Sequence, residues 1–404
     1  MPAPSPLSHG HSHAHRPGPG HGPGHGSGHG TAVVLGTRPE LVKVTELLRL
    51  LGPEARLIHT GQHYDEEMSG RFLTELGLPE PTFLHGVGGR PRAGQLAAGL
   101  EQLDALFAAA PPASVVVQGD TNAALAGALA ANARGIRLVH VEAGLRSHDR
   151  AMPEEHNRVL IDSVADVLCA PTEANRAALR AEGVPDERIE VTGNTVVEAV
   201  RHHLPSPSER AALRARHGLA PDHYVLATLH RPENTDDTGA LRATLAELGA
   251  LAAAGTPVLL PLHPRTRARI DAAGLAPLLA GLTVTGPLGY GAFLGLARDA
   301  ALLVSDSGGV QEEVTVLGRP LVVVRRSTER PEALRDFAEL VRPGAAVGEA
   351  ARRRLAEGAP GLRRLAALPS PFGDGRASER IAALLAPASP APAAPATPAY
   401  APAA

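Results

Sequence analysis

The chain has 404 residues, which is long enough for two domains of ordinary size, each with its own core. Apolar residues make up 44% of it and aromatic residues only 2%, so the cores must be built from Ala, Val and Leu. A formal net charge of -3 argues against nucleic acid or an anionic membrane as a partner, and the single cysteine, Cys169, excludes an internal disulfide and a cysteine zinc cluster.

Both ends of the chain are low in complexity. Residues 1–30 are mainly Gly, Pro, Ser and His, and residues 387–404 are almost only Pro and Ala, so we expect both tails to be disordered. The alternating histidines of the first tail could bind Zn²⁺ or Ni²⁺, but a solvated tail without fixed ligand geometry is the preferred interpretation. We therefore predict no metal site and no cofactor. The N-terminus lacks the apolar segment of a secretory signal, and no apolar run approaches the ~20 residues of a membrane span, so we expect a soluble, cytoplasmic protein.

Short β-branched runs recur between the tails, and Ala- and Leu-rich stretches of helical length, such as 96–109 and 241–254, separate most of them. The first series of predicted strands comprises 31–36, 55–60, 114–119, 136–144, 166–171 and 189–194. The second comprises 224–231, 257–264, 282–287, 301–309 and 320–324. Continuous apolar strands that alternate with helices are typical of parallel sheets covered on both faces. The sequence thus predicts an α/β protein with two Rossmann-like, doubly wound domains, 31–195 and 196–376.

Polar residues gather where these predicted strands end. In open α/β sheets, ligands bind beyond the carboxyl ends of the strands, so we expect one site in the crevice between the domains. In the first domain, Arg38 offers a planar fork to a phosphate, and Lys43 follows it by five residues. Asp120 and Glu142 end consecutive predicted strands, and Glu154 follows a proline at a predicted helix start. Carboxylates gathered beside an anionic ligand have raised pKa values, which suits them to proton transfer.

The second domain supplies candidates for binding a diphosphate. Ser307, Gly308 and Gly309 lie at a predicted helix start, where backbone N–H groups and the helix dipole favour an anion, although an ordinary helix cap is the alternative. Glu313, one turn on, could accept hydrogen bonds from a ribose diol or simply be a solvated helix acid. His230, a candidate catalytic residue, could donate to a phosphate or leaving group, and Arg330 is a further candidate for binding the diphosphate. No GxGxxG with a following ribose acid and no GxxxxGK[ST] are present, which argues against NAD, FAD and ATP hydrolysis.

Taken in order, the motifs resemble those of the non-hydrolysing UDP-N-acetylglucosamine 2-epimerases. They are GTRPE, GDT, HVEAGLR, PEEHNR, TGNTV, HRPEN, DSGGVQEE, TERPE and PFGDG, and they span roughly residues 31–385. The resemblance implies the glycosyltransferase-B architecture, with a C-terminal helix at 377–386 that crosses back to the first domain. It also implies that Asp120, Glu142 and Glu154 are acid–base carboxylates. The diphosphate contacts would then include His230, Arg38, Ser307 and Gly308; Glu313 would bind the ribose and Phe293 would lie on the uracil side.

The implied reaction is a C2 epimerisation of UDP-N-acetylglucosamine to UDP-N-acetylmannosamine without NAD or metal. UDP is eliminated to leave 2-acetamidoglucal and then adds back after protonation of the opposite face of C2. Many bacterial members read GHRRE where this chain reads LHRPENTD, a variant seen in a branch that includes epimerases of modified UDP-hexuronates. The alternatives are thus a modified UDP-2-acetamido sugar such as a diacetamido uronate, or a glycosyltransferase of the same architecture. The resemblance also implies a homodimer.

Overall fold

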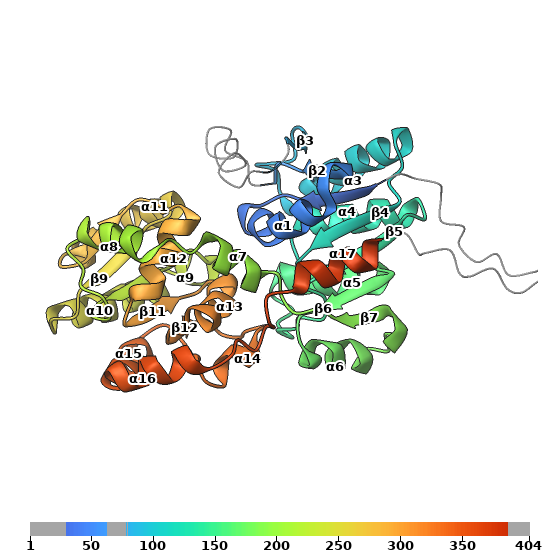
Figure 1. The fold of residues 1–404 in the computed structure, drawn as a ribbon. Coiled ribbons are helices and arrows are strands. Elements are labelled where there is room, and N and C mark those ends of the chain that lie inside the picture. The colour runs from blue at the N-terminus through green and yellow to red at the C-terminus, as the bar shows by residue number, and fades with distance from the viewer. Residues whose placement is uncertain (1–29, 63–77, 79, 387–404) are drawn as a thin grey trace, which may run out of the picture.

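A computed structural model describes residues 30–62, 78 and 80–386, and within them two parallel sheets are covered by helices (Figure 1). The first sheet has the order β3-β2-β1-β4-β5-β6-β7 and consists of β1 (Thr31–Leu35), β2 (Ala55–His59), β3 (Thr82–Phe83), β4 (Ser114–Gln118), β5 (Arg137–Val141), β6 (Val167–Ala170) and β7 (Ile189–Val191). The second has the order β10-β9-β8-β11-β12-β13 and consists of β8 (Val225–Thr228), β9 (Val258–Pro261), β10 (Thr283–Thr285), β11 (Leu302–Ser305), β12 (Leu321–Val324) and β13 (Ala338–Val341).

Helices connect most of the strands. Those of the first half and the join are α1 (Arg38–Leu51), α3 (Arg92–Ala109), α4 (Asn122–Ala133), α5 (Pro153–Val164), α6 (Glu173–Ala181) and α7 (Val196–His203). Those of the second half are α8 (Pro207–Ala215), α9 (Pro232–Thr235), α10 (Thr238–Ala253), α11 (Pro264–Ala272), α12 (Tyr290–Asp299), α13 (Gly308–Leu317), α14 (Pro331–Leu334), α15 (Ala345–Ala356) and α16 (Gly358–Ala367). A last helix, α17 (Ala377–Leu385), follows them.

Every predicted strand coincides with an observed one, although most are a few residues shorter because their last polar residues belong to the loops. The predicted α/β class with two doubly wound sheets is confirmed. In each sheet the order reverses beside a central strand: β1 pairs with both β2 and β4, and β8 pairs with both β9 and β11. These reversals place a crevice at the carboxyl ends of the central strands, where ligands of such sheets bind.

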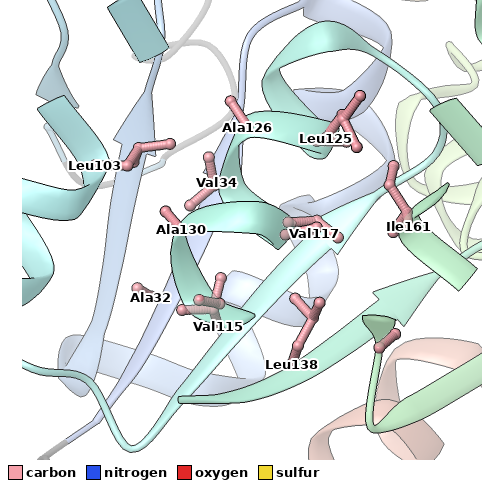
Figure 2. Close-up of a cluster of buried hydrophobic side chains, with 14 of the residues drawn as sticks. Ala32, Val34, Leu103, Val115, Val117, Leu125, Ala126, Ala130, Leu138 and Ile161 are labelled. Carbon is pink, nitrogen blue, oxygen red and sulfur yellow. The ribbon is translucent and has the colours of Figure 1, made fainter. Parts of the chain in front are cut away.

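Small side chains let the helices approach the first sheet closely. Figure 2 shows Ala126 and Ala130 of α4 packed against Val34 and Val117 of neighbouring strands, and all four side chains are buried. A Cβ added at Gly127 would lie 3.0 Å from a methyl of Val117, so this face admits nothing larger. The core is therefore closely packed although it is rich in alanine. Van der Waals contacts between small aliphatic side chains stabilise it, with little contribution from aromatic rings.

The chain passes between the halves at residues 193–195 and returns at 372–377, and the two crossings touch. The backbone N–H of Asn194 donates to the carbonyl of Phe372 at 2.8 Å. A Cβ at Gly373, whose φ is 112°, would lie only 3.0 Å from the Cα of Gly193. Helix α17 then packs on the first half, where Ile381 is fully buried among residues of α1 (Figure 1). In the part of the chain that the structure describes, no helix is long and apolar enough to cross a membrane.

Candidate functional site

A cleft with a volume of about 540 Å³ lies between the two halves, at the carboxyl ends of the central strands. Most of the residues that the sequence singles out line it, namely Arg38, Lys43, Asp120, Glu142, His230, Phe293, Ser307, Gly308, Gly309, Glu313 and Arg330. Glu154 is not among the lining residues. It lies half-buried in the first turn of α5, where its role stays a prediction.

Asp120 follows β4 and is held by an arginine that the sequence analysis did not select. Arg158 of α5 donates from Nε to Asp120 Oδ2 at 2.9 Å, and its Nη2 lies 2.6 Å from the same oxygen. Burial raises the pKa of Asp120, but the charges of Arg158 and Arg330 more than offset burial and bring that pKa below its usual value. Asp120 is therefore an ionised carboxylate at the carboxyl end of the first sheet.

Glu142, which follows β5, has an unusual backbone. Its φ is 72°, in the left-handed region that few residues other than glycine adopt, and such strain is often found at functional sites. Burial, and next the charge of Glu312, raise its pKa, while Lys43 and Arg330 act in the opposite direction. In contrast to Asp120, Glu142 thus binds a proton more readily than an ordinary glutamate.

Lys43 and Arg330 both contact the same two carboxylates, Glu142 and Glu312. Lys43 Nζ lies 2.7 Å from Glu142 Oε2 and 2.8 Å from Glu312 Oε2. Arg330 Nη2 lies 2.8 Å from Glu142 Oε1, and its Nε lies 2.6 Å from Glu312 Oε1. All four side chains are buried. The two predicted cations are thus brought together, but Glu312, the acid beside the predicted Glu313, was missed.

The N-terminus of α13 opens into the cleft. Ser307 is its N-cap residue, and Gly308 begins the helix. A Cβ at Gly308 would lie 2.8 Å from Nη1 of Arg330, so glycine is needed for the guanidinium to approach the helix end. The backbone N–H groups of the helix start, the helix dipole and a neighbouring arginine together favour an anion here.

Glu313, Tyr290 and Phe293 form the far wall of the cleft. Burial raises the pKa of Glu313 to about 7, an effect that the neighbouring Tyr290 hydroxyl partly offsets. Burial and the charge of Glu313 likewise raise the pKa of Tyr290. The carboxyl oxygens of Glu313 could therefore accept hydrogen bonds from the two hydroxyls of a ligand diol.

His230 is exposed at the cleft, and a buried aspartate holds its loop. The backbone N–H groups of His230 and Arg231 donate to the carboxylate of Asp306 at 3.1 and 2.9 Å. His230 Nδ1 lies 3.2 Å from Asp306 Oδ1. Asp306 directly follows β11 inside the SDSGG motif, so its place at a strand end was visible in the sequence although its role was not.

Two further buried acids organise the site. Glu40 in the GTRPE loop accepts hydrogen bonds from Gly36 N at 3.0 Å and from the hydroxyls of Thr37 and Thr121 at 2.7 Å, and burial raises its pKa to about 7. Glu329 lies beside Arg330, and its Oε2 lies 2.8 Å from Nη2 of Arg325. In the described residues, no group of three or more His, Cys, Asp or Glu side chains is arranged to hold a metal ion.

Comparison with known proteins gives consistent matches along this chain. A family model described as UDP-N-acetylglucosamine 2-epimerase matches residues 50–386. The UDP-N-acetylglucosamine 2-epimerase of Methanocaldococcus jannaschii is 37% identical over 363 residues, covering 88% of this chain and 98% of that protein. The UDP-2,3-diacetamido-2,3-dideoxy-D-glucuronate 2-epimerase of Pseudomonas aeruginosa is 34% identical over 362 residues, covering 87% and 98%.

Solved structures match over a similar span. The crystal structure of the M. jannaschii UDP-GlcNAc 2-epimerase in complex with UDP-GlcNAc and UDP has a TM-score of 0.79 at 36% identity, covering 88% of this chain and 99% of that one. The enzyme from Neisseria meningitidis bound to UDP-GlcNAc also has a TM-score of 0.79, at 29% identity. These matches extend over both sheets and the cleft between them.

Proposed function

Because the chain belongs to the UDP-N-acetylglucosamine 2-epimerase family, we propose that it interconverts UDP-N-acetylglucosamine and UDP-N-acetylmannosamine by inverting C2 of the sugar. One observation carries the proposal. Two carboxyl groups with opposite pKa shifts, Asp120 and Glu142, line the same cleft as the anion-binding end of α13.

The reaction that fits these groups is an elimination followed by an addition. A base removes the C2 proton while the C1–O bond breaks, and the bonding electrons leave with UDP. The products in the cleft are 2-acetamidoglucal and UDP. A proton delivered to the other face of C2 and return of the UDP oxygen to C1 then give the epimer, with no net change in atoms or electrons.

The two faces of C2 require two proton-transfer groups. Asp120, which Arg158 keeps ionised, suits the group that accepts a proton, and Glu142 suits the group that holds one. A well-placed acid or base contributes about 10²–10⁴-fold to the rate. Glu154 in α5 is retained as a third carboxylate of this set.

UDP must be held after it leaves the sugar. The N-terminus of α13 with Ser307 and Gly308, together with Arg38 and His230, would stabilise the charge that develops on the diphosphate. Arg330 would contact the same charge. Glu313 would accept hydrogen bonds from the ribose, and Phe293 would face the uracil.

A second substrate is supported by the P. aeruginosa relative, which acts on a UDP-diacetamido-glucuronate. The two candidates are separated by incubating the purified protein with each nucleotide sugar and following the anomeric protons by NMR. We expect UDP-N-acetylglucosamine to equilibrate with its manno epimer. If the protein converts only the diacetamido uronate, that sugar nucleotide is the substrate. If it converts neither compound, the proposal is contradicted.

We also retain a cytoplasmic homodimer as a proposal, supported by the resemblance of the motifs to those of the family. Sedimentation equilibrium should give twice the mass of one chain. A single-chain mass across the working concentration range would contradict the dimer.

A further inference from the structure

Four buried ions form a closed square between the two halves of the molecule. Lys43 of α1 and Glu142 after β5 come from the first half, while Glu312 of α13 and Arg330 before α14 come from the second. Each cation contacts both carboxylates, and each carboxylate uses one oxygen for Lys43 and the other for Arg330, at distances of 2.6 to 2.8 Å. The square is therefore neutral only because Glu312 is part of it.

The two acids of the square differ in their access to a ligand. Glu142 lines the cleft, whereas Glu312 is fully buried and does not. Asn194, at the crossing between the halves, donates to Glu312 Oε1 at 3.0 Å. A buried carboxylate with two cations and an amide donor stays ionised, so Glu312 cannot itself exchange protons with a substrate.

We propose that Glu312 is a positioning residue for Glu142: by sharing Lys43 and Arg330 with it, Glu312 keeps Glu142 able to bind a proton. Without Glu312, both cations would have Glu142 as their shared anion and would hold it as a carboxylate. This role rests on the proposed function, because it concerns the proton that Glu142 would transfer.

The groups that face Glu142 all come from known elements. Lys43 reaches it from α1, Gln118 from β4, and Arg330 from the loop before α14. Glu312 faces it from α13 across the two cations. Arg330 also contacts Glu329, which pairs with Arg325 as well, and it feels the charge of Asp120, which pairs with Arg158. Among the described residues, Glu329 contacts Arg330 but not Lys43, so no ion pair replaces the contact of Glu312 with both cations.

The direct test is a titration of Glu142 in the full-length protein. Glutamate labelled with ¹³C at the side-chain carboxyl is incorporated, and the resonance of Glu142 is identified by its loss in Glu142→Gln. In Glu312→Gln, which keeps the shape of the side chain, we expect the titration midpoint of Glu142 to move to lower pH. Glu349→Gln, an exposed glutamate of α15, serves as the matched control and should leave the midpoint in place.

A Glu142 midpoint that is the same in Glu312→Gln and wild type would overturn the proposal. If Glu312→Gln does not fold, the reciprocal titration decides: coupling between two sites is mutual, so Glu312 should titrate at lower pH in Glu142→Gln than in wild type. An unmoved Glu312 resonance would equally contradict the coupling.

The pH dependence of kcat provides a second readout, which would not change if Glu312 had only a structural role. The limb of the kcat profile that reports Glu142 should shift to lower pH in Glu312→Gln and return toward wild type in Glu312→Asp, which restores the charge. Loss of activity at every pH without a shift, not rescued by the aspartate, would mean that Glu312 only holds the fold. Since the titrations need no turnover, failure of the epimerase proposal is distinguishable from failure of this one.

Discussion

Asp120 accepts hydrogen bonds from a single arginine, whereas Glu142 shares two cations with another carboxylate. The sequence placed both acids at strand ends, because strand ends are visible as the last residues of apolar runs. It could not reveal Arg158 or Glu312, since their partners come from segments distant in the chain. Nor could it separate Glu312 from Glu313: neighbours on a helix point about 100° apart, and only the packing of α13 decides which one enters the cleft.

Removing either proton-transfer group should abolish most turnover. We expect Asp120→Asn and Glu142→Gln each to lower kcat by at least about 10²-fold, because each removes one acid–base group. UDP affinity, measured by isothermal titration calorimetry, should change little. Loss of UDP binding together with activity would show that these carboxylates hold the site together rather than transfer protons.

Glu313 should make the unfolding free energy of the protein decrease as the pH rises. Burial raises its pKa from 4.5 to about 7, so the folded protein binds this proton more tightly than the unfolded chain does. Its contribution to stability is complete below pH 4.5 and is lost as the pH rises through 7. Glu313→Gln cannot ionise, and its unfolding free energy relative to wild type should therefore rise by up to about 3 kcal/mol over that pH range.

Urea unfolding of wild type, Glu313→Gln and the exposed control Glu349→Gln at both ends of the range measures this change. The control should keep a constant difference from wild type. A constant difference for Glu313→Gln as well would contradict a raised pKa at this position.

At the scale of elements, the strands were readable because parallel strands covered on both faces are continuous apolar runs. The structure adds two that were not expected, β3 and β13. β3 has only two residues, and β13 is an edge strand whose sequence, AELV, carries an acid. Helix α17 ends at Leu385, within the 377–386 segment that the family resemblance implied, and its contacts with α1 tie the end of the described chain to the first half.

Helix α17 should contribute to the stability of the first half through its buried face. Ile381 is fully buried, so Ile381→Ala should lower the unfolding free energy by about 2–5 kcal/mol through lost apolar contact and the cavity left behind. Glu379→Gln, an exposed change on the same helix, should stay within about 0.5 kcal/mol of wild type. Equal effects of the two changes would mean that α17 is not packed as described.

At the scale of the whole molecule, the two halves contact each other at the crossings of the chain and at the square of Lys43, Glu142, Glu312 and Arg330, three of which line the cleft. The family resemblance implied that the chain crosses back to the first domain, but the residue patterns could not reveal the contact between the crossings or the ion square, because both depend on how the two sheets face each other. The motifs TGNTV and PFGDG nevertheless carry the glycines of the crossing. Because the two crossings approach so closely, each has a glycine, which lacks a side chain, at the point of contact.

The crossing should tolerate no added atom. Gly373→Ala introduces a Cβ 3.0 Å from the Cα of Gly193, in a backbone conformation with φ of 112°. Gly281, whose φ is 84° and which has nothing within 4 Å of an added Cβ, isolates the backbone strain alone. Gly373→Ala should destabilise the protein by about 1–3 kcal/mol more than Gly281→Ala, as overpacking does, and chemical unfolding measures both. Equal losses would contradict a tight crossing.

The proposed proton transfer at C2 is tested most directly by running the reaction in deuterated water. UDP-N-acetylglucosamine is incubated with the protein, and the C2 position of both epimers is followed by NMR. We predict that UDP-N-acetylmannosamine forms with deuterium at C2 and that the recovered UDP-N-acetylglucosamine gains deuterium at the same carbon. Epimerisation that leaves the original hydrogen at C2 in both sugars would contradict exchange through Asp120 and Glu142.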